Sequence, residues 1–412
     1  MLLSSALWQA GRTLTRMDVN SESNPGLVTL TEILSSCTTL TTLNYTTKYR
    51  MSVLLGDFSV VNDTHPLTSI SIKADAIDGQ DMEILLQRCQ QLRRITLDGC
   101  DESIFEPIGR LAHRLRVLGY NHPFKIPQHE EEMNTCGIKM IYGNDNDDIT
   151  FNAIFPLIYK NRKSLHYIVG SIEDPTALEM ETFRTTYANF TLDKLNMFGI
   201  RQTPHIQSIF LRSIPDAAPI NSLSLINVFS TNGLVNSLKL LRQTPEIFML
   251  FRTHDSDSTS ALSCLFEHYS RRSPLSGVLK TVSFHYCTQI TDPVLSNLGK
   301  IKTLKHINLT GIPKITTQGI SLLITTLSDC LLNITLMDLD AVDNSILIAI
   351  GRCDSVSKVK LESLKKVDSV GVRDMINTRG SRLTKLMIKD CRAVSEECTK
   401  FAKMVVKEVI HS

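Results

Sequence analysis

Aromatic residues are scarce in this chain. They make up 6% of its 412 residues, and tryptophan occurs once. No apolar run approaches the roughly 20 residues that an α-helix needs to cross a bilayer. Neither sign of charge is in excess, because 44 basic residues stand against 42 acidic ones and the net charge is +2. That balance gives no general argument for a nucleic acid or an anionic membrane, and we expect neither as a partner.

The sequence also lacks the signatures of catalysis and of cofactor binding. Its 19 glycines are dispersed, and it has neither the G-x-x-x-x-G-K-S/T loop that cradles phosphates nor a G-x-S-x-G nucleophile elbow. His285 and Cys287 are two residues apart. We expect Cys287 beyond the end of its strand, where the chain turns, so the two should not form a zinc site or a catalytic pair. The sequence therefore predicts a protein that is not an enzyme, with no cofactor and no metal site.

The ten cysteines contain no C-x-x-C pair. Six of them stand in equivalent places, three residues after the last apolar residue of an expected strand or three before its first: Cys100, Cys287 and Cys391, and Cys37, Cys89 and Cys353. A free cysteine packs as a small hydrophobic residue. We therefore expect buried free thiols in a reducing compartment, the cytoplasm or the nucleus, rather than a disulfide framework.

The sequence is rich in one spacing pattern, L-x-x-L-x-L followed by a helical stretch, which recurs about every 26 residues. Its clearest copy is Leu279-x-x-Val282-x-Phe284-x-x-Cys287. The third apolar positions of the copies form this series: Val19, Tyr45, Ile72, Leu97, Tyr120, Met140, Gly170, Met197, Leu225, Met249, Phe284, Leu309, Leu339, Leu361 and Ile388. Such a segment cannot bury its apolar face alone, so copies must stack side by side.

Stacking of these copies predicts an α/β fold, a leucine-rich-repeat solenoid of horseshoe shape. Parallel strands would line its concave face and helices its convex face, because parallel strands need crossover connections. We expect one array of about 15 repeats over residues 1–412. Residues 121–165 are irregular and include an acidic segment, 128–148, which we expect to be a solvated loop or, alternatively, a partner contact. We expect residues 252–278 to form a long polar connection around a short helix.

The clearest copy, LKTVSFHYCTQITDPVLSNL (279–298), continues from its cysteine to Ile290, Thr291 and Asp292 and then to an apolar helix. It resembles the cysteine-containing leucine-rich repeat of F-box proteins of the ribonuclease-inhibitor-like type. The resemblance implies a non-catalytic substrate receptor of a Skp–cullin–F-box ubiquitin ligase, whose repeats hold a target protein and whose F-box docks the adaptor and cullin. No F-box is visible in the sequence, where the tryptophan is Trp8. The alternative is a stand-alone scaffold or inhibitor unrelated to ubiquitin.

The candidate partner-binding residues flank the last apolar positions of each strand, since alternate side chains of a strand point to opposite faces. On the concave face of the C-terminal repeats they are His285, His306, Asn308, Lys358, Lys360, Glu362, Lys385, Met387 and Lys389. Four lysines on two adjacent strands predict a local basic patch that docks an acidic or phosphorylated segment of a protein partner. The alternative is that these charges only keep an exposed ridge soluble. Aromatic stacking platforms for nucleic acid are missing.

Overall fold

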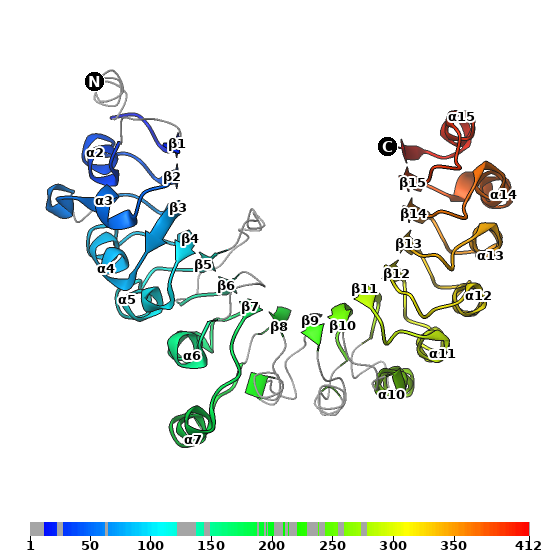
Figure 1. Ribbon diagram of the computed structural model, residues 1–412, viewed down its shortest axis with the longest axis horizontal. Coiled ribbons are helices and arrows are strands. Elements are labelled where there is room, and N and C mark those ends of the chain that lie inside the picture. Colours follow the sequence, from blue (N-terminus) through cyan, green and yellow to red (C-terminus); the bar gives the residue numbers. More distant parts are fainter. Residues whose placement is uncertain are drawn as a thin grey trace. The chain divides into compact units, whose positions relative to one another are not determined.

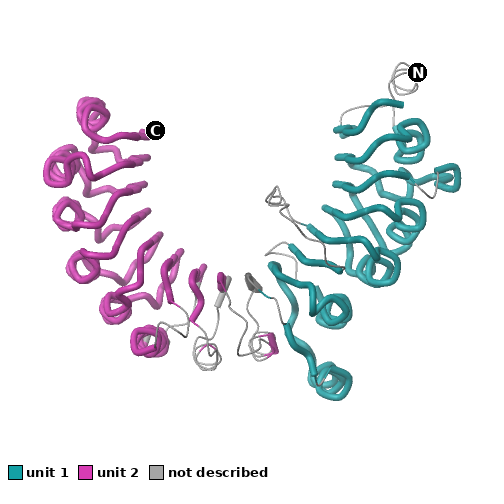
Figure 2. Tube along the Cα trace, turned by 180° about the vertical axis from the view of Figure 1, so that it is seen from behind, with its two compact units in different colours: residues 1–195 teal, residues 196–412 magenta. Residues whose placement is uncertain are grey.

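Strands and helices alternate along nearly the whole chain (Figure 1). The computed structural model describes residues 12–411 except 23–27, 62–64, 122–136, 144–148, 188, 193–194, 196, 202–208, 211–212, 214–220, 229–237, 239–243, 254–258 and 273–277. The chain divides into two compact units, residues 1–195 (unit 1) and 196–412 (unit 2), shown in different colours in Figure 2. The prediction of one continuous array of about 15 repeats stays a prediction.

Unit 1 has a parallel sheet in which strands pair in sequence order. Its described strands are β1 (Arg16–Asn20), β2 (Thr42–Thr46), β3 (Ser69–Ile77), β4 (Arg94–Cys100), β5 (Val117–Tyr120), β6 (Met140–Tyr142) and β7 (Tyr167–Ser171). Its described helices are α2 (Leu30–Ser36), α3 (Met51–Leu55), α4 (Gly79–Arg88), α5 (Phe105–Leu111), α6 (Phe151–Asn161) and α7 (Ala177–Thr186), with 3-10 turns at Phe58–Val60 and Glu102–Ile104.

Unit 2 repeats the same plan, and its strands also pair in parallel in sequence order. Its described strands are β8 (Met197–Arg201), β9 (Ser222–Val228), β10 (Ile247–Thr253), β11 (Thr281–Cys287), β12 (His306–Thr310), β13 (Asn333–Met337), β14 (Lys358–Glu362), β15 (Lys385–Lys389) and β16 (Glu408–His411). Its described helices are α10 (Thr259–Ser270), α11 (Asp292–Gly299), α12 (Thr317–Thr326), α13 (Asn344–Arg352), α14 (Ser369–Arg379) and α15 (Glu396–Val405), with a 3-10 turn at Gly380–Arg382.

Each repeat buries its apolar strand positions between the sheet and the helices. In β12, Ile307 and Leu309 are 2% and 0% exposed, whereas His306 and Asn308 lie on the open face of the sheet. Burial of these side chains against neighbouring repeats supplies the stability that one repeat lacks by itself. The predicted α/β leucine-rich-repeat fold is confirmed in this respect: each unit is a parallel sheet with its helices packed on one side.

The chain turns in the same way at the end of six successive strands of unit 2. The residue at this turn has a positive φ of about 50° in each repeat: Arg252, Tyr286, Gly311, Asp338, Ser363 and Asp390. Residues other than glycine rarely adopt this conformation. Its recurrence at one register position shows that the stacked repeats impose it. The turn puts Tyr286 on the surface and returns Cys287, which ends β11, to the core.

Polar side chains at the helix starts tie one repeat to the next. The Asp292 carboxylate at the start of α11 accepts hydrogen bonds from the backbone N–H of Thr316 (2.9 Å) and from its hydroxyl (2.6 Å). Thr316 in turn caps α12 by accepting a hydrogen bond from the Gly319 N–H. Such caps satisfy N–H groups that a helix cannot satisfy itself. A Cβ at Gly319 would lie 2.0 Å from the Asp292 carboxylate, so glycine is required at this contact.

Four members of the predicted strand series are misplaced. Strand pairing puts Leu250 rather than Met249 opposite Leu225, and Ile200 takes the place assigned to Met197. Strand pairing puts Leu336 opposite Leu309, so the predicted Leu339 lies three residues after the correct position. Met140 is wrong by three residues as well, because it pairs with Val117. In these copies a further apolar residue stands near the strand and imitates the repeat spacing.

The other expectations on fold have mixed outcomes. The six cysteines expected in the core are buried with one exception, Cys100, which is partly exposed. The acidic segment 128–148 lies largely outside the described residues, but within it β6 is a strand rather than a loop. The stretch 252–278 contains the 12-residue helix α10, which packs against α11 as an ordinary repeat helix. Among the described helices, none is both long and apolar enough to cross a membrane.

Candidate partner-binding face

The open face of the unit 2 sheet carries three rows of side chains that run across the strands (the strand face below). Strand pairing sets their membership from β10 to β16. The first row is Ile247, Thr281, His306, Asn333, Lys358, Lys385 and Glu408, and the second is Met249, Ser283, Asn308, Thr335, Lys360, Met387 and Ile410. The third row ends at β15 and is Phe251, His285, Thr310, Met337, Glu362 and Lys389. All nine residues predicted from the sequence therefore lie on one face.

The lysines of β14 and β15 are largely paired with carboxylates. Glu362 lies 2.8 Å from Lys360 and 2.8 Å from Lys389, between two strands. Hydrogen bonds from the Lys360 and Lys389 ammonium groups hold the pKa of Glu362 below its usual range. The hydrogen bond to Glu362 raises the pKa of Lys389. Lys385 contacts Glu408 of β16 at 2.6 Å. The predicted patch therefore remains basic, but it contains two glutamates beside its four lysines.

Lys358 differs from the other three lysines. Its side chain is exposed, and among the described residues it makes no ion pair. It stands in the first row, between Asn333 and Lys385. An exposed ammonium without a competing carboxylate is the cation that an acidic ligand can reach at least cost, because no existing pair has to be broken.

The other end of the strand face is aromatic and polar. The rings of Phe251 and His285 stack with centroids 4.4 Å apart and planes 4° from parallel. The side-chain amide nitrogen of Asn308 lies 3.3 Å from Nε2 of His285, and the Asn308 oxygen accepts a hydrogen bond from the Thr310 hydroxyl at 3.2 Å. Because the amide nitrogen can only donate, Nε2 of His285 is the acceptor. Burial lowers the pKa of His285, so a neutral imidazole with its proton on Nδ1 fits this site.

His306 stands between these two ends. Its Nδ1 is buried and has no hydrogen-bond partner within the part of the chain that the structure describes. Burial lowers the pKa of His306, and the nearby charges of Lys305 and Lys358 lower it further. A neutral His306 offers a polar contact without adding positive charge. The strand face thus changes from aromatic through neutral polar to basic between β10 and β15.

Sequence reasoning overlooked residues of this face on three strands, β13, β10 and β16. Asn333, Thr335 and Met337 of β13 lie between the histidines and the lysines, and they were missed because Leu339 was taken for Leu336. Phe251 was missed because the predicted register of this strand was wrong by one residue, with Met249 in the position that Leu250 holds. Glu408 lies in β16, for which no strand was expected. The alternation N-I-T-L-M at 333–337 was the signal that could have revealed β13.

The histidine and cysteine considered for metal binding point in different directions. The Cys287 thiol is fully buried and donates to the carbonyl of Leu250 at 3.3 Å, whereas the His285 ring lies on the strand face. No three His, Cys, Asp or Glu side chains within the described ranges are arranged to hold a metal ion. The geometry of the strand face suits contacts with another molecule and holds no recognisable nucleophile–base pair.

The repeat geometry of both units defines a leucine-rich-repeat protein. No family model matches the sequence, and no curated protein matches it. Solved structures that resemble the chain at low identity include the following three. Yeast Rad7, in a complex with Elc1, has 14% identity and a TM-score of 0.45, with coverage of 87% of this chain and 79% of that one. A leucine-rich-repeat protein of Leptospira interrogans has 15% identity and a TM-score of 0.40, with coverage of 99% of this chain and 98% of that one. An internalin of Listeria monocytogenes has 14% identity and a TM-score of 0.39, with coverage of 98% of this chain and 88% of that one.

Proposed function

We propose that this chain is a non-catalytic protein-binding module that holds a partner on the strand face of unit 2. The observation that supports this most is the order of side chains along the rows, from the Phe251–His285 stack to the exposed Lys358. These side chains project from strands that neighbouring repeats hold in place, so the face is preorganised for binding.

The partner that suits this face has an apolar or aromatic anchor and, some distance away, a group of acidic residues. Strands lie about 4.8 Å apart, so β11 and β14 are separated by roughly 14 Å. An extended peptide spans this distance in about four residues at 3.3 Å each. The anchor would pack on Phe251 and His285, and the acidic or phosphorylated residue would reach Lys358. Affinity would fall with rising salt, since the acidic contact is partly exposed.

We propose further that the module recognises substrates for a Skp–cullin–F-box ubiquitin ligase. The support for this step is the resemblance of residues 279–298 to the repeats of F-box proteins. In the structure Cys287 and Ile290 fill the core and Asp292 joins two helix starts, so these residues account for the architecture. Adaptor and cullin would be recruited through an F-box, which these 412 residues do not visibly contain. A stand-alone scaffold or inhibitor is the competing function.

Affinity capture from native cells, with quantitative mass spectrometry, tests both parts. The bait is the full chain in three forms: wild type, Lys358→Glu, and Lys366→Glu as a control with the same charge change at an exposed lysine outside the rows. A partner of the strand face should be captured equally by wild type and Lys366→Glu, and at least tenfold less by Lys358→Glu. Equal capture by all three rejects the strand face. Recovery of an adaptor and a cullin supports the ligase role, and their absence beside a specific partner favours the scaffold.

A further inference from the structure

One position of the repeat becomes basic in four successive repeats of unit 1. It lies immediately before each strand, and its backbone N–H donates to the carbonyl of the same position in the preceding repeat: Arg116 to Arg93 at 2.7 Å, Lys139 to Arg116 at 2.8 Å, and His166 to Lys139 at 2.8 Å. In the three preceding repeats this position is a threonine: Thr15, Thr41 and Thr68. The charge is therefore confined to the part of the unit that contains β4, β5, β6 and β7.

Six exposed or partly exposed cations gather at this end of the strands, and we call them the cationic edge: Arg93, Arg114, Arg116, Lys160, Arg162 and Lys163. None of the six forms an ion pair with a carboxylate among the described residues. Those with hydrogen bonds use neutral acceptors: Arg114 donates to the side chain of Gln91, and Arg162 to the carbonyl of Tyr159 at 2.9 Å. Nearby Arg110 behaves differently, since it lies 3.0 Å from Glu83 and 3.1 Å from Glu106.

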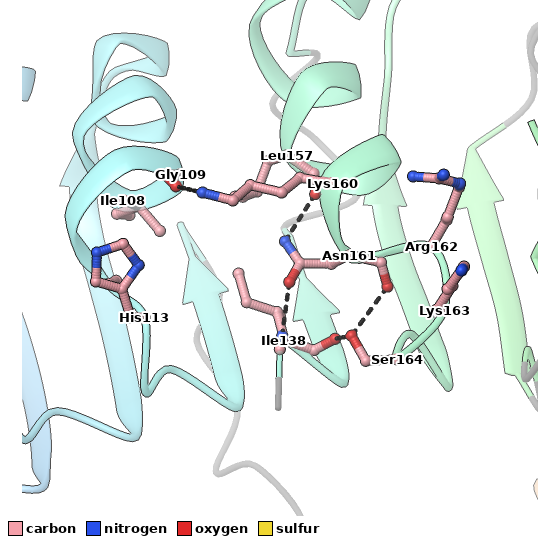
Figure 3. Close-up of a pocket in the computed structure, with 12 residues that line it drawn as sticks. Ile108, Gly109, His113, Ile138, Leu157, Lys160, Asn161, Arg162, Lys163 and Ser164 are labelled. Carbon is pink, nitrogen blue, oxygen red and sulfur yellow. Dashed lines mark hydrogen bonds between the residues drawn. The ribbon is translucent and has the colours of Figure 1, made fainter. Parts of the chain in front are cut away.

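A cavity of about 430 Å³ opens within the cationic edge, between the last turns of α5 and α6 (Figure 3). His113 borders it on the α5 side, and Lys160 reaches across it to the carbonyl of Gly109. Its wall is held by Asn161, whose side chain accepts from the Ile138 N–H and donates to the Leu157 carbonyl, both at 2.8 Å. The edge thus combines positive charge with a preformed hollow that could receive a side chain.

The helix dipole explains only part of this charge. Cations are stabilised at helix C-termini, and Lys160 lies in the last turn of α6. Arg93, Arg114 and Lys163 lie beyond the helices, in the connections to the strands. The corresponding connections of unit 2 contain carboxylates as well, such as Glu246 and Asp354, which pair with Lys280 and Arg382. Like charges that have no counter-charge within the described part of the chain repel one another at a cost in stability, and a bound anion would remove that cost.

We propose that the cationic edge is a second interaction surface, separate from the strand face, that binds an extended acidic segment of a protein partner. From Arg93, before β4, to Lys163, before β7, the cationic edge extends over three strand spacings, or about 15 Å at roughly 4.8 Å each. Lys139, before β6, is buried and is not one of its cations. Acidic side chains on one side of an extended peptide recur about every 7 Å, so two or three of them match this length. Arginine binds carboxylates through two parallel hydrogen bonds.

Single-stranded nucleic acid fits the cationic edge less well. It needs exposed aromatic rings on which bases stack. The Tyr159 ring at this edge is covered by the Arg162 guanidinium 4.2 Å from its centroid, and the ring that borders the cavity is the small imidazole of His113. A duplex would need cations spread over both of its backbones, whereas these six lie along one edge of the unit 1 sheet. A carboxylate-rich peptide is therefore the occupant that the geometry favours.

Fluorescence anisotropy with a labelled octaglutamate peptide tests the proposal on the full chain. The edge variant combines Arg93→Gln, Arg114→Gln and Lys163→Gln, three exposed positions whose loss opens no core. The control combines Lys300→Gln, Lys302→Gln and Lys314→Gln, three exposed lysines of unit 2 outside the strand-face rows, with the same change in net charge. We expect the edge variant to bind octaglutamate at least tenfold more weakly than wild type and the control to bind within twofold of it.

Three results would overturn the proposal. The first is equal affinity of the edge variant and wild type, with circular dichroism showing that both are folded. The second is equal loss in the edge variant and the control, which would mean that net charge alone draws the peptide. The third is tighter binding of a labelled dodecauridylate or a 20-base-pair DNA duplex than of octaglutamate, with that binding lost in the edge variant, which would assign the edge to nucleic acid.

Discussion

The ring of Tyr120 occupies the space that a side chain of Gly143 would need. A Cβ built on Gly143 would lie 2.2 Å from the ring, and one on Gly170 would lie 2.8 Å from the Tyr120 hydroxyl oxygen. These glycines stand in the two repeats that follow Tyr120, at the register position where other repeats bury a large apolar residue. One fully buried tyrosine therefore fills the interior of three repeats.

Gly143→Ala should destabilise unit 1. Overpacking a filled interior by one methyl group typically costs about 1–3 kcal/mol, and this contact is with the ring of a side chain that has no free space to move into. Thermal unfolding followed by circular dichroism measures the effect. Gly109→Ala is the matched control, since its Cβ would meet Leu157 at an ordinary 3.5 Å within a helix. An unchanged melting temperature for Gly143→Ala would show that the Tyr120 ring does not lie there.

Leu309→Asp should unfold several repeats of unit 2 together. Leu309 is fully buried in β12, and an unpaired carboxylate in such a place costs at least several kcal/mol. Because each repeat is stabilised by its neighbours, the loss should spread beyond β12. Hydrogen exchange read by mass spectrometry would show which repeats lose protection. Leu322→Asp, on the exposed face of α12 and 53% accessible, should leave protection intact; similar effects of both substitutions would contradict the strand register.

Glu362→Gln should reduce stability at neutral pH and have no effect in acid. The pKa of Glu362 is lowered by Lys360 and Lys389, so its stabilising contribution is present above the unfolded pKa, about 4.3, and disappears as the pH falls through the folded value. We expect a difference of about 1 kcal/mol at pH 7, because the two lysine side chains are 34% and 47% exposed. Denaturant unfolding of both proteins between pH 3 and 7 measures it.

The same experiment in a Lys360→Gln/Lys389→Gln background provides its control. Without the two ammonium groups, replacement of Glu362 should make little difference at any pH. A difference between Glu and Gln that stays constant from pH 7 to pH 3 would mean that the ion pairs do not stabilise the folded chain.

Alkylation of the cysteines should be strongly selective. The thiolate is the reactive form of cysteine, and burial raises the pKa of Cys89 to about 12 and of Cys353 to about 11. At pH 8 their thiolate fraction is therefore very small and reagent access is blocked. Cys264 is exposed on α10 and should react with iodoacetamide at least tenfold faster, as read by peptide mapping. In denaturant all three should react alike. Rapid native-state alkylation of Cys89 or Cys353 would place that thiol outside the core.

The repeat architecture could be predicted because it follows from the spacing of apolar residues that are close together in the sequence. The positions of Ile307 and Leu309 and the apolar face of α12 each follow from a few neighbouring residues, and burial in the stack confirms them. At Met140 the prediction failed because the core of that repeat is filled from another repeat. No local pattern reveals that Tyr120 replaces the side chains of Gly143 and Gly170, so Met140 was assigned to the wrong register.

The same contrast between local patterns and contacts between repeats applies to the candidate surfaces. Alternation along a strand was enough to place Lys358 and Lys360 on one face, because that rule concerns adjacent residues of a single segment. The pairing of Lys385 with Glu408 and the alignment of Arg93 with Arg116 depend on which strands become neighbours. The sequence by itself thus determined the repeat, its buried positions and the side of the sheet on which each polar residue stands. Only the tertiary structure decided which charges neutralise one another and which remain unpaired, because electrostatic pairing depends on distances between segments some 25 residues apart in the chain.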